Sequence, residues 1–202
     1  MLTPYKMNFR KIPEEAARLF LRLGFSPNGI TILGLVLGIL TCFIFVWNKN
    51  AVLFGFLMIF FGLFDAVDGA AARLTNQITK FGSYLDAICD RIFESAALLA
   101  AGCVTGRWIL SFCLMAGVFL VSYAKARAAM EVTISNTEWP DFMERTERDI
   151  IFAIGMIFWG FFPKNIFGGD IFFWTMVFLN LAVYGTVFQR ILRAKKFIEL
   201  RM

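Results

Sequence analysis

Long apolar runs, separated by short polar segments, fill most of the chain. A helix needs about 20 mostly apolar residues to cross a bilayer, and six runs qualify, although charged residues interrupt two of them. The six runs cover roughly residues 29–47, 51–72, 82–105, 107–129, 147–163 and 171–189. We therefore predict an all-α integral membrane protein in which residues 1–202 form a single domain and residues 27–202 form a bundle of six transmembrane helices.

A different pattern marks the N-terminus. Residues 12–25 begin with Pro13 and two glutamates, which favour the start of a helix. The apolar residues that then share one helical face are Ala16, Leu19, Phe20 and Leu23. We predict that residues 1–26 contain an amphipathic helix in the cytoplasmic membrane interface, and that the chain turns at Gly24 to enter the first span.

Composition and charge set the class and the orientation. The chain is 59% hydrophobic and 17% charged, which is typical of a membrane protein rather than of a soluble domain. Its net charge is +5, but the short turns on one side hold only Lys49, Arg107 and Lys164, and the other basic residues lie towards the side of the termini. This asymmetry follows the positive-inside rule. We expect a multi-pass protein of the cell membrane with both termini and the aspartate motif cytoplasmic, and no nucleic-acid partner.

Four aspartates interrupt the second and third runs, where ionised side chains are costly and usually functional. Asp65 and Asp68 are three residues apart, and Asp86 and Asp90 are four apart, so each pair lies on one face of a helix. Two adjacent helices would bring the four carboxylates into one small volume, where they would hold protons unless cations neutralised them. Because the chain has no His, a hard ion such as Mg²⁺, Mn²⁺ or Ca²⁺ is favoured. The alternative is that these aspartates cap helices or pair with nearby arginines.

The spacing of these residues resembles a family signature. From Asp65 to Asp90 the chain reads D-x-x-D-G-x-x-A-R, eight residues, then G-x-x-x-D-x-x-x-D, which is similar to the pattern of the CDP-alcohol phosphatidyltransferases. The resemblance implies an enzyme that transfers the lipid phosphate of a CDP-lipid to an alcohol and releases CMP. It also implies two bound Mg²⁺ or Mn²⁺ ions held by the four aspartates, Asp90 as the base for the attacking hydroxyl, and a homodimer.

The same resemblance suggests a site for the CDP-lipid, either CDP-diacylglycerol or CDP-archaeol. The segment from Pro27 to Thr31 matches the P-N-x-x-T pattern that precedes the first span in this family. The residues expected to bind the donor are Asn28, Gly29, Ile30, Thr31, Gly69, Arg73 and Thr79. Alternatively, Arg73 anchors its helix by reaching lipid headgroups, and the glycines serve close helix packing.

Basic residues near span ends form the expected acceptor site. They are Lys125, in a Ser-Tyr-x-Lys-Ala-Arg segment, Arg145 and Arg148, in a Glu-Arg-x-Glu-Arg segment, and Arg190 after the sixth run. These segments resemble those that hold the acceptor's phosphate in the inositol-phosphate branch of the family, so the expected acceptor is inositol 1-phosphate. Met143 replaces the small residue usual in that branch, which leaves glycerol 3-phosphate and serine open. The alternative is that these cations are topology anchors.

A small cation transporter would also place carboxylates within a membrane. Transporters often contain internal repeats and helices that are broken at mid-membrane depth. Residues 29–105 and 107–189 show no repeat of one another, and the aspartates cluster at span ends. These features favour the enzyme over the transporter.

Overall fold

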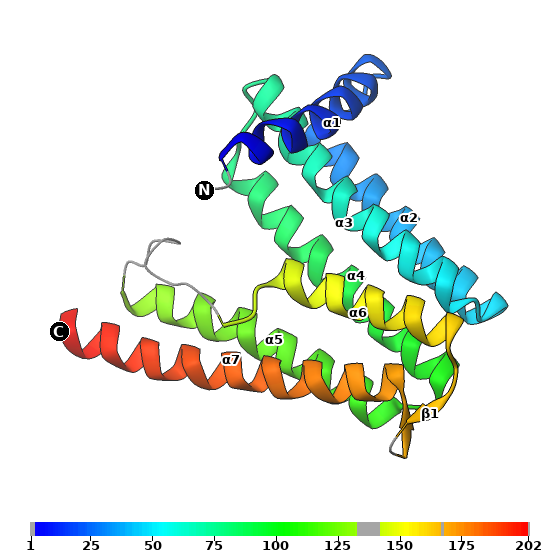
Figure 1. Ribbon diagram of the computed structural model, residues 1–202. Coiled ribbons are helices and arrows are strands. Elements are labelled where there is room, and N and C mark those ends of the chain that lie inside the picture. The colour runs from blue at the N-terminus through cyan, green and yellow to red at the C-terminus, as the bar shows by residue number, and fades with distance from the viewer. Residues whose placement is uncertain (1–2, 133–141, 167, 202) are drawn as a thin grey trace.

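The computed structural model describes residues 3–132, 142–166 and 168–201, which form seven helices and one short β-hairpin (Figure 1). The helices are α1 (Thr3–Arg22), α2 (Pro27–Asn48), α3 (Ala51–Leu74), α4 (Lys80–Thr105), α5 (Trp108–Glu131), α6 (Arg145–Phe161) and α7 (Ile171–Arg201). Strands β1 (Asn165–Ile166) and β2 (Gly169–Asp170) pair antiparallel. The predicted helical architecture is confirmed, and a helix covers each of the six apolar runs.

Among the described residues, four helices are long and apolar enough to cross a membrane: α2, α3, α5 and α7 as far as Glu199. The other two helices at predicted runs differ from these in sequence. Helix α4 carries the charged residues Asp86, Asp90, Arg91 and Glu94, and α6 has only 17 residues, about 25 Å of helix. Asp86, Asp90 and Arg91 of α4, and Arg145 and Arg148 of α6, line the site described below.

Polar side chains cap the helices that carry the predicted site. Ser26 at the start of α2 and Thr79 at the start of α4 each accept a hydrogen bond from the backbone N–H three residues on, at 3.1 and 2.9 Å. Helix α6 begins with a capping box formed by Glu144 and Glu147. Such caps satisfy N–H groups that have no partner within the helix. They fix where each helix begins, and therefore which residues its first turns present to the site.

The larger of the two buried apolar clusters among the described residues joins α2 to α7 and includes Phe45, Phe54 and Phe172. Phe45 of α2 and Phe54 of α3 are buried, and their rings stack with centroids 4.2 Å apart. At Gly55 an added Cβ would lie 2.5 Å from Ile157 of α6, so glycine allows α3 and α6 to approach closely. Helix α6 also packs on α7, which pairs with α5. This packing fixes the position of the α6 arginines.

Helix α1 packs on α3 (Figure 1). It runs through Pro13, so the prediction that the helix starts there was wrong. Ala17 is fully buried beside Val67, and Phe20 meets the ring of Phe64 edge to face at 5.5 Å. The chain turns at Gly24, as predicted, with a φ of +87° that glycine adopts without strain.

The predicted apolar face of α1 is only partly buried in the structure. Ala16 and Phe20 pack against the core, whereas Leu19 and Leu23 are exposed. The exposed leucines leave an apolar surface on a helix that lies beside the membrane-spanning segments.

An ion pair closes the opposite side of the bundle. Arg107 donates hydrogen bonds to both carboxylate oxygens of Asp170, at 2.8 and 2.5 Å, and the backbone N–H of Phe173 donates to the same carboxylate at 2.8 Å. Burial alone would raise the pKa of Asp170, but these hydrogen bonds outweigh it and hold the pKa below the ordinary value of 3.8. The pair ties the β-hairpin to the turn between α4 and α5.

Candidate active site

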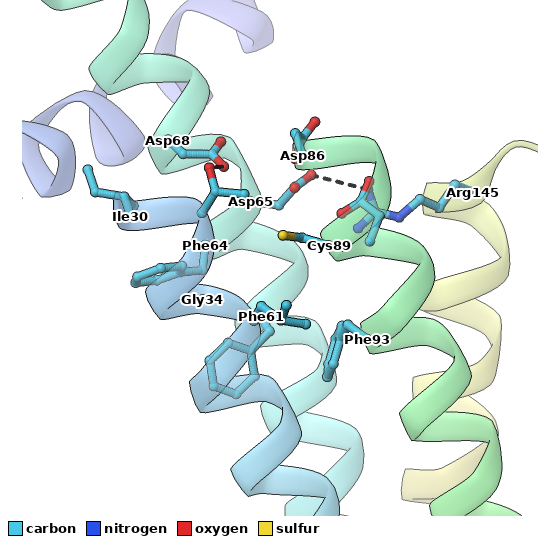
Figure 2. Close-up of a pocket in the computed structure, with 13 residues that line it drawn as sticks. Ile30, Gly34, Phe61, Phe64, Asp65, Asp68, Asp86, Cys89, Phe93 and Arg145 are labelled. Atoms are coloured by element: carbon cyan, nitrogen blue, oxygen red, sulfur yellow. Dashed lines mark hydrogen bonds and ion pairs between the residues drawn. The ribbon is translucent and has the colours of Figure 1, made fainter. Parts of the chain in front are cut away.

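Three aspartates from two helices converge at the centre of the site. Asp65 and Asp68 lie in the last three turns of α3, and Asp86 lies in the second turn of α4. One carboxylate oxygen from each lies within 4.8 Å of the other two, and Figure 2 shows the three side chains near one another between the two helices. The predicted convergence of carboxylates is therefore present for these three residues.

Two neighbours orient Asp68. The hydroxyl of Thr31 donates a hydrogen bond to Oδ2 at 2.6 Å, and the N–H of Gly69 donates to Oδ1 at 2.5 Å. Thr31 belongs to α2, so the start of the first predicted span and the aspartate motif contribute to the same site. Such hydrogen bonds fix the direction in which a carboxylate presents its oxygens.

Asp90 lies one turn beyond Asp86 on α4, outside the group of three aspartates that the described residues form. Its carboxylate accepts a hydrogen bond from Arg145 of α6. Arg145 also lies 3.6 Å from Asp65 and 3.3 Å from Asp149. The guanidinium group of Arg145 thus contacts carboxylates from α3, α4 and α6. Asp90 lies between the aspartate cluster and the arginines of α6.

The aspartates form one wall of a space of about 400 Å³, including the part open to solvent, which we call the carboxylate cavity. Its other wall is apolar. Ile30 and Gly34 of α2 contribute to it, as do Phe61, Phe64 and Phe93, which lie below the aspartates in Figure 2. An apolar chain can therefore lie directly beside the charged groups, as in sites that bind amphipathic ligands.

A second space, of about 670 Å³ including the part open to solvent, shares Thr31, Asp68 and Asp86 with the carboxylate cavity; we call it the loop groove. Five of the seven residues predicted to bind the CDP-lipid line it: Asn28, Thr31, Gly69, Arg73 and Thr79. Six further residues line the loop groove without having been assigned to the donor from the sequence: Pro27, Ala72, Gln77, Ile78, Gly82 and Ser83. Gln77 and Ile78 lie in the connection between α3 and α4, where no motif position marked them, whereas Gly82 in the first turn of α4 is a glycine of the signature.

The other two predicted donor residues lie elsewhere. The N–H of Gly29 donates to the cap residue Ser26, and Ile30 is fully buried and lines the carboxylate cavity. Both residues therefore shape the start of α2 without lining the loop groove. Successive helical residues point in different directions, and the assignment of Gly29 and Ile30 to the CDP-lipid site stays a prediction.

A third space, of about 1190 Å³ including the part open to solvent, collects basic residues; we call it the basic pocket. All four residues predicted to bind the acceptor phosphate line it: Lys125 of α5, Arg145 and Arg148 of α6, and Arg190 of α7. Arg148 and Arg190 are only 4% and 7% exposed, and Arg190 donates a hydrogen bond to the carbonyl of Val121. Such burial is not what an anchor in lipid headgroups would show. Arg145 lines the carboxylate cavity as well, so the two spaces meet at this residue.

Two further residues of this region were not predicted. Arg91 lines the basic pocket, and its Nη1 lies 2.7 Å from Oε2 of Glu94. Glu94 is 9% exposed and also accepts hydrogen bonds from Arg148. A signal was present in the sequence, since Glu94 follows Asp90 by four residues and so shares a helical face with it.

The ligand set of the carboxylate cavity suits a divalent cation. The convergent group consists of carboxylates alone, and oxygen ligands select hard ions such as Mg²⁺ and Mn²⁺. A bound cation would also offset the mutual repulsion of Asp65, Asp68 and Asp86. The residues present therefore fit the predicted metal.

Comparison with known proteins decides the family. Residues 25–188 match the sequence model of the CDP-alcohol phosphatidyltransferases, a range that contains every residue lining the carboxylate cavity and the loop groove. The chain belongs to this family. It is a metal-dependent phosphotransferase of phospholipid biosynthesis, and its apolar helices make it a membrane protein.

Curated relatives place the chain near one branch of the family. It is 33% identical over 160 residues to the archaetidylinositol phosphate synthase of Pyrococcus horikoshii. The aligned residues make up 78% of this chain and 83% of the relative. It is 32% identical over 163 residues to the phosphatidylinositol phosphate synthase of Mycobacteroides abscessus, and the aligned residues make up 76% of this chain and 72% of that relative. Both similarities extend well beyond the aspartate motif.

Solved structures agree with this similarity. A crystal structure of the Mycobacterium tuberculosis phosphatidylinositol phosphate synthase with CDP-DAG bound matches with a TM-score of 0.78 at 29% identity, over 91% of this chain and 94% of that one. The structure of the same enzyme with manganese and citrate matches with a TM-score of 0.79 at 29% identity, over 90% and 88%. The chain therefore shares the fold of these synthases.

Proposed function

We propose that this enzyme transfers a phosphatidyl-type group, diacylglycerol phosphate or archaeol phosphate, from a CDP-lipid to inositol 1-phosphate and releases CMP. The observation that carries the proposal is the arrangement of the three spaces. The loop groove joins the carboxylate cavity at Thr31, Asp68 and Asp86, and the basic pocket joins it at Arg145. A donor and a phosphorylated acceptor would therefore approach the same carboxylates from two sides.

The loop groove would bind the cytidine diphosphate of the donor. Arg73 offers a planar guanidinium, which suits two oxygens of a pyrophosphate. Asn28 and Thr79 offer an amide and a hydroxyl, and Gly69 leaves room for the ligand. The lipid chains would leave along the phenylalanines of the carboxylate cavity towards the bilayer. The related synthase that has been solved with CDP-DAG bound supports a donor of this class.

Asp65, Asp68 and Asp86, with Asp90, would hold two divalent cations, Mg²⁺ or Mn²⁺. When bound, such ions would offset the negative charge of the pyrophosphate and of the leaving CMP. The related synthase solved with manganese supports this assignment. Thr31 contributes by holding the carboxylate of Asp68 in one orientation.

Asp90 would act as the general base. It takes the proton of the acceptor's hydroxyl while the hydroxyl oxygen forms a bond to the lipid-bearing phosphorus, and the bond from that phosphorus to the oxygen of CMP breaks. Its place between the carboxylate cavity and the basic pocket suits this role, because a base must lie within hydrogen-bond reach of the proton that it takes. The hydrogen bond from Arg145 holds the carboxylate in place.

The basic pocket would bind the phosphate of the acceptor. Charge-assisted hydrogen bonds from Lys125, Arg145, Arg148 and Arg190 favour an anion over a neutral group. The names of the two curated relatives support an inositol-phosphate acceptor. Met143 is buried at the pocket wall, and its size favours a smaller acceptor, so glycerol 3-phosphate is the second candidate. Serine, the third, has no phosphate for this pocket.

The proposal includes the placement of the enzyme in the cell membrane. All six of helices α2 to α7 would span the bilayer, with α4 and α6 turning their charged faces towards the site. The exposed Leu19 and Leu23 of α1 suit a helix in the membrane interface. The basic residues on the side of the termini put the three spaces on the cytoplasmic side, and the family resemblance implies a homodimer.

The test is acceptor-dependent release of CMP by the purified protein in Mg²⁺. CDP-diacylglycerol and CDP-archaeol are supplied in turn with inositol 1-phosphate, free inositol, glycerol 3-phosphate or serine. We expect the fastest release with inositol 1-phosphate. Faster release with glycerol 3-phosphate would reassign the acceptor, and no release with any pair would contradict the proposed activity.

A further inference from the structure

Three carboxylates follow one face of α4 at intervals of four residues: Asp86, Asp90 and Glu94. Asp86 belongs to the aspartate cluster, and Asp90 accepts a hydrogen bond from Arg145. One turn deeper, Glu94 meets Arg148 in the same way. The two arginines lie three residues apart on α6, so the facing sides of the helices pair turn by turn.

The two carboxylate oxygens of Glu94 interact with two different arginines. Oε1 accepts hydrogen bonds from Nε and Nη2 of Arg148, at 3.3 and 3.2 Å. Oε2 is buried and accepts no hydrogen bond from the described residues, so its charge is compensated by the 2.7 Å ion pair with Nη1 of Arg91. Both arginines line the basic pocket, whereas Glu94 does not; it lines an inner cavity that it shares with Arg148, Asp149 and Phe152. Glu94 therefore lies behind the pocket wall.

We propose that Glu94 is a positioning residue for the acceptor: it holds Arg91 and Arg148 at the wall of the basic pocket, and Arg91 joins the residues that bind the acceptor's phosphate. The inference rests on the proposed function. Arg148 is 4% exposed, and the side chain of Arg91 is 16% exposed, so both have lost most of their hydration. Two poorly hydrated guanidinium groups repel each other, so they need a nearby negative charge to remain side by side.

The division of charge leaves this group able to bind an anion. Glu94 compensates one of the two guanidinium charges, and the neighbouring carboxylate of Asp149 forms its ion pair with Arg145, at 3.3 Å. The positive charge of Arg91 and Arg148 that Glu94 does not compensate is left for a phosphate. Arg148 turns Nε and Nη2 towards Glu94, and within the described part of the chain no hydrogen bond uses its Nη1. Because Arg148 is already oriented, its side chain does not have to be ordered when the acceptor binds, which strengthens binding.

The test is Glu94→Gln in the full-length enzyme. Glutamine keeps the volume and one acceptor oxygen but removes the charge that holds Arg91. We expect the KM for the phosphorylated acceptor to rise about 10-fold, while kcat and the KM for the CDP-lipid stay close to the wild-type values. Inorganic phosphate, titrated by calorimetry, should lose affinity by the same factor. The matched control is Glu131→Gln, which removes an ion pair with Arg127 at the exposed end of α5 and should change neither quantity.

A double-mutant cycle separates positioning from overall stability. In an Arg148→Ala background, Glu94→Gln should raise the acceptor KM by a smaller factor than in the wild type, because part of its effect acts through Arg148. Full additivity would overturn the proposal, as would a single variant with the wild-type acceptor KM and phosphate affinity. If Glu94→Gln does not fold, Glu94→Asp replaces it and should give the same selective rise on a smaller scale, whereas an equal loss for both substrates would overturn the proposal. A wild type that uses no phosphorylated acceptor contradicts the proposed function alone, and the phosphate titration then still decides the role of Glu94.

Discussion

Arg145 of α6 donates a hydrogen bond to the carboxylate of Asp90 on α4. The two residues were assigned from the sequence to different tasks, one to the acceptor's phosphate and the other to its hydroxyl. Their contact means that both tasks meet at one point, where the carboxylate cavity and the basic pocket join. An acceptor held by its phosphate in the basic pocket would therefore present a hydroxyl near Asp90.

Asp90→Asn is expected to remove most of the turnover and to preserve much of the affinity for the CDP-lipid. Asparagine keeps the shape and a hydrogen-bond acceptor for Arg145 but cannot take a proton, and loss of a general base typically costs 10²–10⁴-fold in rate. Single-turnover rates and the CDP-lipid KM check this. Asp65→Asn and Asp68→Asn should in addition weaken the binding of metal and donor. A wild-type rate for Asp90→Asn would mean that another group is the base.

Removal of divalent metal is expected to abolish transfer. EDTA should stop CMP release, and Mg²⁺ or Mn²⁺ should restore it, because the convergent carboxylates of Asp65, Asp68 and Asp86 form an oxygen-only site for a hard cation. Binding of Mn²⁺, followed by electron paramagnetic resonance, should weaken about 10-fold or more in Asp86→Asn. Full activity in chelator would rule out the metal site.

The sequence predicted the helices and most of the site because their signals are local. Apolar runs identify α2 to α7, and charged residues at intervals of three and four within those runs identify Asp65, Asp68 and Asp86. A cluster of basic residues at span ends identifies Lys125, although only the fold shows that it shares one pocket with the α6 and α7 arginines.

What the sequence did not predict depends on packing between distant segments. The pairing of Glu94 with Arg148 joins residues that are 54 positions apart, and it exists because α6 is held in place by α3 and α7. Similarly, the burial of Ile30 depends on its contacts with α1 and α3. A motif position alone does not say whether such a residue lines a groove or supports it from behind.

Arg73→Ala is expected to raise the KM for the CDP-lipid about 10-fold, since Arg73 lines the loop groove and would contact the pyrophosphate. The acceptor KM should change little. Lys80→Ala is the matched control, because Lys80 is an exposed basic residue near the same end of the bundle but outside the loop groove. Equal effects of the two substitutions would show that Arg73 is a membrane anchor.

Asp170→Asn is expected to lower the free energy of unfolding by about 1–3 kcal/mol without changing kcat, because it removes charge-assisted hydrogen bonds with Arg107 on the side away from the site. The pKa of Asp170 is held below 3.8, so the stabilisation is present above that pH and is lost as the pH falls through the lower folded-state pKa. Thermal unfolding in detergent at pH 7 and below pH 4 checks both points. The difference between wild type and variant should shrink at the lower pH, and a constant difference would contradict this account of Asp170.

The most direct test of the proposed reaction is the product that the purified enzyme forms from CDP-diacylglycerol and inositol 1-phosphate in Mg²⁺, measured by mass spectrometry together with CMP. We expect one CMP for each molecule of a lipid that carries both the transferred phosphate and the phosphate of the acceptor, and very little product from free inositol. Equal conversion of free inositol, or CMP release without an inositol-phosphate lipid, would contradict the account.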